Sequence, residues 1–152
     1  MDKLDPQQRS RNMSRVRGKN TAPEMRVRKV AHRIGLRFRL HRKDLPGRPD
    51  LVFPRYRLAV FVHGCFWHRH PGCSRASMPS TRPNFWQTKF DANVARDHRQ
   101  VEALEAAGWS VLVLWECELK DEACVEARLR ERTIAAAHTV SGRARTSLDA
   151  GR

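Results

Sequence analysis

One loop in the middle of the chain gathers most of the side chains that could do chemistry. Residues 63–73 contain three histidines, two cysteines and the aromatic pair Phe66 and Trp67. The apolar run at residues 58–62, directly before the loop, predicts a buried strand that would deliver these side chains to the end of a sheet. Loops at strand ends carry the binding and catalytic residues of many α/β proteins, so we take this loop as the functional centre.

Soft metal ligands form the first pattern in the loop. Cys65, His70 and Cys73 are spaced so that a short chain can wrap a tetrahedral ion such as zinc. Cys117 follows a second apolar run, residues 109–115, and parallel pairing of the two runs would bring it to the edge that carries Cys65. A closed site of four ligands leaves no position for a substrate, so we predict a structural zinc ion.

This assignment leaves two alternatives open. His68 lies two residues before His70 and could be the ligand in its place. The thiols could also be unrelated to one another, because free cysteines are common in protein cores. Cys124, on the last predicted helix, lies apart from the others and receives no role.

A second pattern suits the hydrolysis of a phosphodiester. Asp50 opens a predicted strand and His63 follows the next one, so carboxylate and imidazole could meet at one sheet edge. Such a reaction needs an oxygen ligand for magnesium and a base for water, and Asp50 with His63 or His68 could supply both. The alternative for Asp50 is a solvated aspartate in a turn.

The balance of charge indicates the partner. The 152 residues include 30 Lys and Arg against 16 Asp and Glu, and a net charge of +14 favours a polyanion, above all nucleic acid. No apolar run reaches the length of a membrane span, so we expect no membrane partner. The polar first residues lack the apolar core of a secretion signal, which predicts a reducing compartment and cysteines that are ligands or free thiols.

Hydrophobic periodicity predicts one α/β domain. Helices are expected at residues 21–34, 85–104 and 121–136, and strands at 36–41, 51–53, 58–62 and 109–115. This α-β-β-β-α-β-α order predicts a mixed central sheet flanked by helices. We expect a basic arm at residues 1–20, the single folded domain at 21–137 and a disordered basic tail at 138–152.

Aromatic side chains in so basic a protein indicate contact with bases. Phe66 and Trp67 lie in a loop with glycine, proline and polar neighbours, where burial is difficult. Together with Trp86 they suggest stacking on bases or wedging between them, although all three could also be core residues. Glu24, by contrast, is explained by the helix-capping box that begins at Thr21.

Four short segments carry a resemblance that extends over about residues 9–132: PGRPD at residues 46–50, HGCFWH at 63–68, NFW at 84–86 and WEC at 115–117. They resemble the very short patch repair (Vsr) endonucleases. The resemblance implies a restriction-endonuclease-like fold, similar to that of the PD-(D/E)xK nucleases. It also implies an enzyme that nicks DNA beside the T of a T:G mismatch, formed when 5-methylcytosine is deaminated, and so initiates very short patch repair.

The resemblance also implies roles for single residues. Asp50 would be the magnesium ligand, helped by the backbone carbonyl of Val62, with His68 as the general base. His63 and Glu24 would support that site. The implied structural zinc ligands are Cys65, His70, Cys73 and Cys117. The implied wedge into DNA is Phe66, Trp67 and Trp86, with Met13 entering from the other groove.

The implied partners are double-stranded DNA with a T:G mismatch, mismatch-repair proteins of the MutL type and DNA polymerase I. The implied setting is the bacterial cytoplasm, where a monomer would associate with the nucleoid. Two other functions stay open: a restriction-type nuclease of the same fold, which would cut both strands of a matched site, and a zinc-stapled nucleic-acid-binding module without activity.

The chain departs from the family pattern at three points. Val62 stands where the pattern has threonine, and Pro71-Gly72 shifts the spacing to Cys73. The acid-x-lysine of PD-(D/E)xK nucleases does not follow Asp50. The mechanism must therefore lean on histidine.

Overall fold

The computed structural model describes residues 21–149, with side chains as far as residue 136. One mixed sheet has the order β1-β2-β3-β4 and consists of β1 (Arg39–Leu40), β2 (Leu51–Phe53), β3 (Leu58–His63) and β4 (Ser110–Trp115). β1 and β3 run antiparallel to β2, whereas β4 runs parallel to β3. This confirms the predicted mixed sheet.

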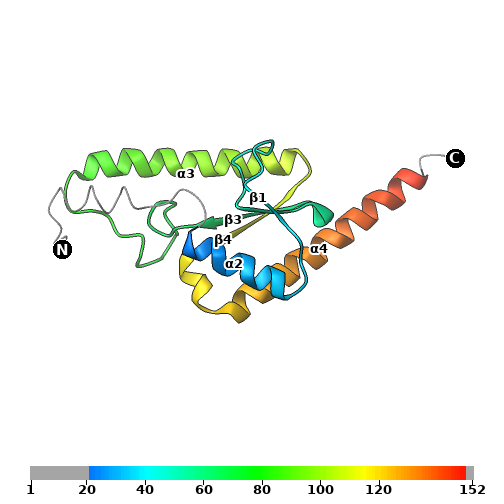
Figure 1. The fold of residues 1–152 in the computed structure, drawn as a ribbon. Helices are drawn as coiled ribbons and strands as arrows, with labels where there is room; N and C mark the ends of the chain where they lie inside the picture. Colours follow the sequence, from blue (N-terminus) through cyan, green and yellow to red (C-terminus); the bar gives the residue numbers. More distant parts are fainter. Residues whose placement is uncertain (1–20, 150–152) are drawn as a thin grey trace.

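Helices cover both faces of the sheet. They are α2 (Ala22–Arg33), α3 (Pro83–Ala106) and α4 (Glu122–Asp149). Short 3-10 turns connect β2 to β3 (η1, Pro54–Tyr56) and β4 to α4 (η2, Glu116–Lys120). Figure 1 shows α3 along one face, while α2 and α4 lie against the other. The α-β-β-β-α-β-α order of helices and strands is therefore the predicted one. No helix within the described part of the chain combines the length and apolar character needed to cross a membrane.

β3 is apolar from Leu58 to Val62 because both of its faces are covered. Leu58 and Val60 pack with the residues of α2 and α4, whereas Ala59 and Phe61 pack on the side of α3. Successive side chains of a strand point to opposite faces, so a strand buried on both sides needs a continuous apolar run.

The register of β3 and β4 places their ends together. His63 is paired with Trp115, so Cys65 and Cys117 each follow two residues after the paired ends of parallel strands. The prediction that these two cysteines emerge at one edge of the sheet is confirmed.

Two elements differ in extent from the sequence prediction. The strand predicted at 36–41 is reduced to β1, because Leu36 and Phe38 pack against the core beside α2 without entering the ladder. The last helix continues to Asp149 instead of ending near residue 136. Periodicity reports only the part of a helix that packs on a core, and Figure 1 shows the end of α4 leaving the body of the domain. The division into arm, domain and tail stays a prediction, and residues 1–20 lie outside the described part.

Candidate functional site

A carboxylate is held at the start of β2 beside the end of β3. The backbone N–H of Val62 donates to Oδ2 of Asp50 at 2.7 Å. Ligand-type atoms of Asp50, Glu24 and His41 lie within 4.8 Å of one another, and we call these three residues the acidic cluster. Burial raises the pKa of Asp50 to about 7, and the nearby Glu24 adds to the rise. A buried carboxylate with an acidic neighbour is disposed to accept a cation.

Glu24 has two separate roles in this arrangement. Its backbone N–H donates to Oγ1 of Thr21 at 3.4 Å and so caps α2, as the sequence predicted. Its carboxylate is only 4% exposed and lies 3.2 Å from Nη2 of Arg28 and 3.5 Å from Nε2 of His41. The capping box therefore explains the main chain of Glu24 but leaves its side chain for the acidic cluster.

A second group lies on the side of α3 and consists of His63, His68 and Asp97, which we call the histidine cluster. Nδ1 of His68 lies 2.7 Å from Oδ2 of Asp97, and the rings of His63 and His68 stack with centroids 3.9 Å apart. Burial lowers the pKa of His63 to about 4. The cluster borders a cavity of about 300 Å³, which Val94 and Val101 of α3 also line. An imidazole fixed by a carboxylate at the rim of a cavity is suited to proton transfer.

Sequence reasoning missed Asp97. The residue lies on the inward face of α3, in the series Phe90, Val94, Asp97, Val101 and Leu104. A carboxylate in a stripe that is otherwise apolar was the available signal, because such a position requires a polar partner inside the protein.

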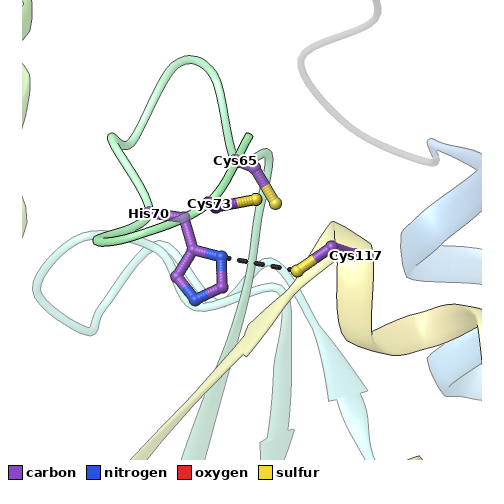
Figure 2. A group of neighbouring side chains, drawn as sticks. All are labelled: Cys65, His70, Cys73 and Cys117. Carbon is purple, nitrogen blue, oxygen red and sulfur yellow. Dashed lines mark hydrogen bonds between the residues drawn. The ribbon is translucent and has the colours of Figure 1, made fainter. Parts of the chain in front are cut away.

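The four expected metal ligands come together at the same edge of the sheet. Ligand atoms of Cys65, His70, Cys73 and Cys117 all lie within 4.8 Å of one another, and we call these residues the metal cluster. Figure 2 shows His70 turned to Cys117, with Nδ1 and Sγ 3.4 Å apart. His70 is thus the histidine that joins the thiols, whereas His68 joins Asp97.

This donor set fits zinc. Three thiol sulfurs and one imidazole nitrogen are a common set of ligands for a tetrahedral structural zinc ion. Burial raises the pKa of the Cys65 thiol to about 11, so a thiolate there requires a compensating cation. Cys124 does not belong to the metal cluster.

The aromatic side chains of the loop pack against α3. Phe66 contacts Trp67, Trp86 and Phe90, with ring centroids 5.1, 5.9 and 5.2 Å apart, and we call these four residues the aromatic cluster. Trp86 is 8% exposed and Phe90 1%, whereas Phe66 and Trp67 are partly exposed. The helix thus supplies the apolar partners that the loop itself lacks. Met13, the fourth residue of the implied wedge, lies outside the described residues.

The mixed sheet with helices on both faces is a class of fold that a solved endonuclease domain also has. The fold is similar to that of the catalytic domain of the homing endonuclease I-Bth0305I, with a TM-score of 0.55 and 20% identity. The similarity covers 77% of this chain and 98% of that domain. At this identity the likeness concerns the fold alone.

Sequence comparison gives the family. The family model described as DNA mismatch endonuclease Vsr matches residues 1–75. The DNA mismatch endonuclease Vsr of Escherichia coli K12 is 43% identical over 136 residues, or 86% of each chain. The type II nicking enzyme V.XorIIP of Xanthomonas oryzae pv. oryzae is 57% identical over 129 residues, which cover 85% of this chain and 94% of the relative. The chain belongs to the Vsr family, as its motifs indicated, and is a DNA-cleaving hydrolase of the nicking type.

Proposed function

We propose that this protein nicks one strand of duplex DNA beside the T of a T:G mismatch, in a magnesium-dependent hydrolysis that initiates very short patch repair. The observation that carries the proposal is the pair of groups at the end of β3. The acidic cluster offers oxygen ligands on one side, and the histidine cluster offers a base on the other. Val62 of β3 holds Asp50, and the next residue, His63, stacks on His68, so both clusters lie at the same end of β3.

Asp50 and the backbone carbonyl of Val62 would hold a magnesium ion. When bound, that ion would polarise the phosphate and stabilise the charge that develops on it. The N–H of Val62 keeps Oδ2 of Asp50 in place, so the carboxylate is oriented before the ion arrives. Glu24 adds negative charge beside it, which favours a cation.

His68 would act as the general base. Nδ1–H of His68 would donate a hydrogen bond to Oδ2 of Asp97, which leaves Nε2 as the nitrogen that takes a proton from water. The water oxygen then bonds to phosphorus while one ester P–O bond breaks, and the sugar oxygen that leaves takes a proton from solvent. Asp97 stabilises the imidazolium that forms, and the buried, neutral ring of His63 supports it from one face.

The metal cluster would hold one structural zinc ion, which fixes the loop between β3 and α3. The exposed edges of Phe66 and Trp67, with Trp86 behind them, would enter the mismatched step. A T:G wobble pair is weaker than a matched pair, so opening the step beside it takes less of the few kcal/mol that unstacking requires. Lys and Arg would supply the affinity for phosphates that is independent of sequence. We also propose that the enzyme is a monomer associated with the nucleoid. Mismatch-repair proteins and DNA polymerase I would then act on the nicked DNA.

The test is incubation with magnesium and duplexes that differ only in one base pair, T:G, U:G or matched. We expect a single nick in the T-containing strand of the T:G duplex. Cutting of both strands of a matched duplex would instead identify a restriction-type nuclease. Binding without any cleavage would contradict the catalytic role of both clusters.

A further inference from the structure

Three consecutive side chains of the loop serve three different clusters. His68 reaches Asp97 of α3, His70 reaches Cys117 after β4, and the side chain of Arg69 between them turns to the aromatic cluster. The backbone of Arg69 has a left-handed φ of 56°, a conformation that is costly for a residue with a side chain. This turn allows His68 to lie in the histidine cluster while His70 lies in the metal cluster.

The guanidinium of Arg69 is occupied by contacts within the protein. Nη1 donates to the backbone carbonyls of Phe66 at 3.3 Å and Ser77 at 3.0 Å, and Nη2 donates to that of Ala76 at 2.7 Å. Its central carbon lies 4.0 Å from the ring centroid of Phe90. Arg69 therefore connects two separate parts of the loop, Phe66 and residues 76–77, to Phe90 of α3.

Only arginine can make this set of contacts. A planar fork with five N–H donors can serve three carbonyls in different directions while its face stacks on a ring, whereas lysine offers one ammonium point. The same contacts distinguish Arg69 from a residue whose main partner is a DNA phosphate. Such a residue keeps its donors directed to solvent until DNA arrives.

We propose that Arg69 is a positioning residue for the opening of DNA: it stiffens the loop so that Phe66 and Trp67 enter the duplex without giving way. The proposal rests on the proposed entry of these rings into the mismatched step. Unstacking a base step costs a few kcal/mol. If moving the loop cost less free energy than this, the rings would be displaced and the base step would stay closed. Without Arg69 the rings keep their apolar surface but lose their fixed orientation.

The kinetic test compares Arg69→Ala with Arg130→Ala, a matched loss of one charge on the exposed face of α4. We expect Arg69→Ala to lower the single-turnover nicking rate on T:G DNA by about tenfold to a hundredfold, the range expected when a reacting geometry is displaced. Binding to matched DNA should fall no more than it does for Arg130→Ala. Methylguanidinium at low, non-denaturing concentration should restore part of the rate to Arg69→Ala and none to Arg69→Lys.

A second readout needs no DNA. With 5-fluorotryptophan incorporated, the fluorine resonances of Trp67 and Trp86 should shift or broaden in Arg69→Ala, while that of Trp109, which contacts Arg42 and Arg57, should not. Zinc content should equal that of the wild type. If Arg69→Ala does not fold, the same measurements are made on Arg69→Lys.

Different failures have different signatures. A wild-type rate in Arg69→Ala, or unchanged resonances of Trp67 and Trp86, would overturn the positioning role. An equal loss of binding to matched DNA would show that Arg69 is a phosphate contact. If the wild-type enzyme shows no preference for T:G DNA, the proposed function fails, and the fluorine resonances still decide whether Arg69 holds the rings.

Discussion

The imidazole rings of His63 and His68 stack face to face, with centroids 3.9 Å apart and planes inclined by only 4°. Two imidazolium ions in this position would repel each other, so the pair favours at most one charge. Burial and, after it, the proximity of His68 lower the pKa of His63 to about 4. His63 is therefore the neutral member, which leaves His68 for the proposed role of general base.

Asp97→Asn should slow nicking because His68 loses its fixed orientation and its counter-charge. An amide at this position can donate to Nδ1 and so favour the wrong tautomer. We expect a fall of about tenfold to a hundredfold in the single-turnover rate, against about two to four orders of magnitude for His68→Ala. DNA binding should change little in either variant.

The double variant gives the control for this prediction. If Asp97 acts only through His68, adding Asp97→Asn to His68→Ala should cause no further loss. A further loss in the double variant would show that Asp97 has another role, such as binding a metal ion directly.

Cys117→Ser should lose the zinc ion and, with it, a few kcal/mol of stability, because metal affinity is part of the folding free energy. Elemental analysis should find one zinc per chain in the wild type and little in the variant. Cys124→Ser is the matched control, since this cysteine is partly exposed and lies outside the metal cluster. Equal zinc content in both variants would rule out the proposed ligand set.

The metal cluster could be predicted in large part because it depends on strand order. Parallel strands joined by a crossover helix end at the same edge, and the pairing of His63 with Trp115 brings Cys65 and Cys117 together there. The choice between the two histidines could not be made from spacing. It depends on the left-handed backbone of Arg69, which nothing in the order of residues reveals.

Contacts between distant elements explain what sequence reasoning missed. Asp97 lies on a helix whose inward residues follow the usual spacing, and only the position of the loop against α3 identifies His68 as its partner. The carboxylate of Glu24 received a role only from the family resemblance, and reasoning from the residues alone gave it none for a different reason. Its backbone N–H makes the helix cap that the sequence pattern predicts. This cap already explained why a glutamate stands at position 24, so the pattern did not indicate that its side chain has partners of its own.

Asp50→Asn should stabilise the protein in magnesium-free buffer at high pH. Burial raises the pKa of Asp50 from 3.8 to about 7, so the folded state holds this proton more tightly than the unfolded chain. The contribution of this group to stability is therefore complete below about pH 4 and declines as the pH rises to about 7. Asparagine has no charge to desolvate and avoids that decline.

Urea unfolding at several pH values measures the effect. We expect a gain on the order of 2 kcal/mol for Asp50→Asn at pH 8 and almost none near pH 4. Adding magnesium should narrow the gap, because the ion stabilises only the wild type. Asp44→Asn is the control, since this exposed carboxylate pairs with Arg42 and its pKa is lowered. A gain for Asp50→Asn that is the same at every pH would contradict the assignment.

Trp67→Ala should separate mismatch recognition from general DNA binding. The ring of Trp67 is partly exposed, contacts Phe66 and Trp86, and lies 5.3 Å from Nζ of Lys89. If it enters the mismatched step, its loss removes stacking worth about 1–3 kcal/mol and lowers T:G nicking about tenfold to a hundredfold. Trp67→Phe should keep most of the activity, because a smaller ring still stacks.

Salt dependence supplies the decisive comparison for Trp67→Ala. Affinity for matched DNA comes mainly from Lys and Arg on phosphates and falls steeply with salt. Trp67 carries no charge, so the slope of log Kd against log salt should be the same in the variant and the wild type on both duplexes. The intercept of this plot should differ between Trp67→Ala and the wild type on T:G DNA alone. Equal shifts on matched and mismatched duplexes would mean that the ring only packs the loop against α3.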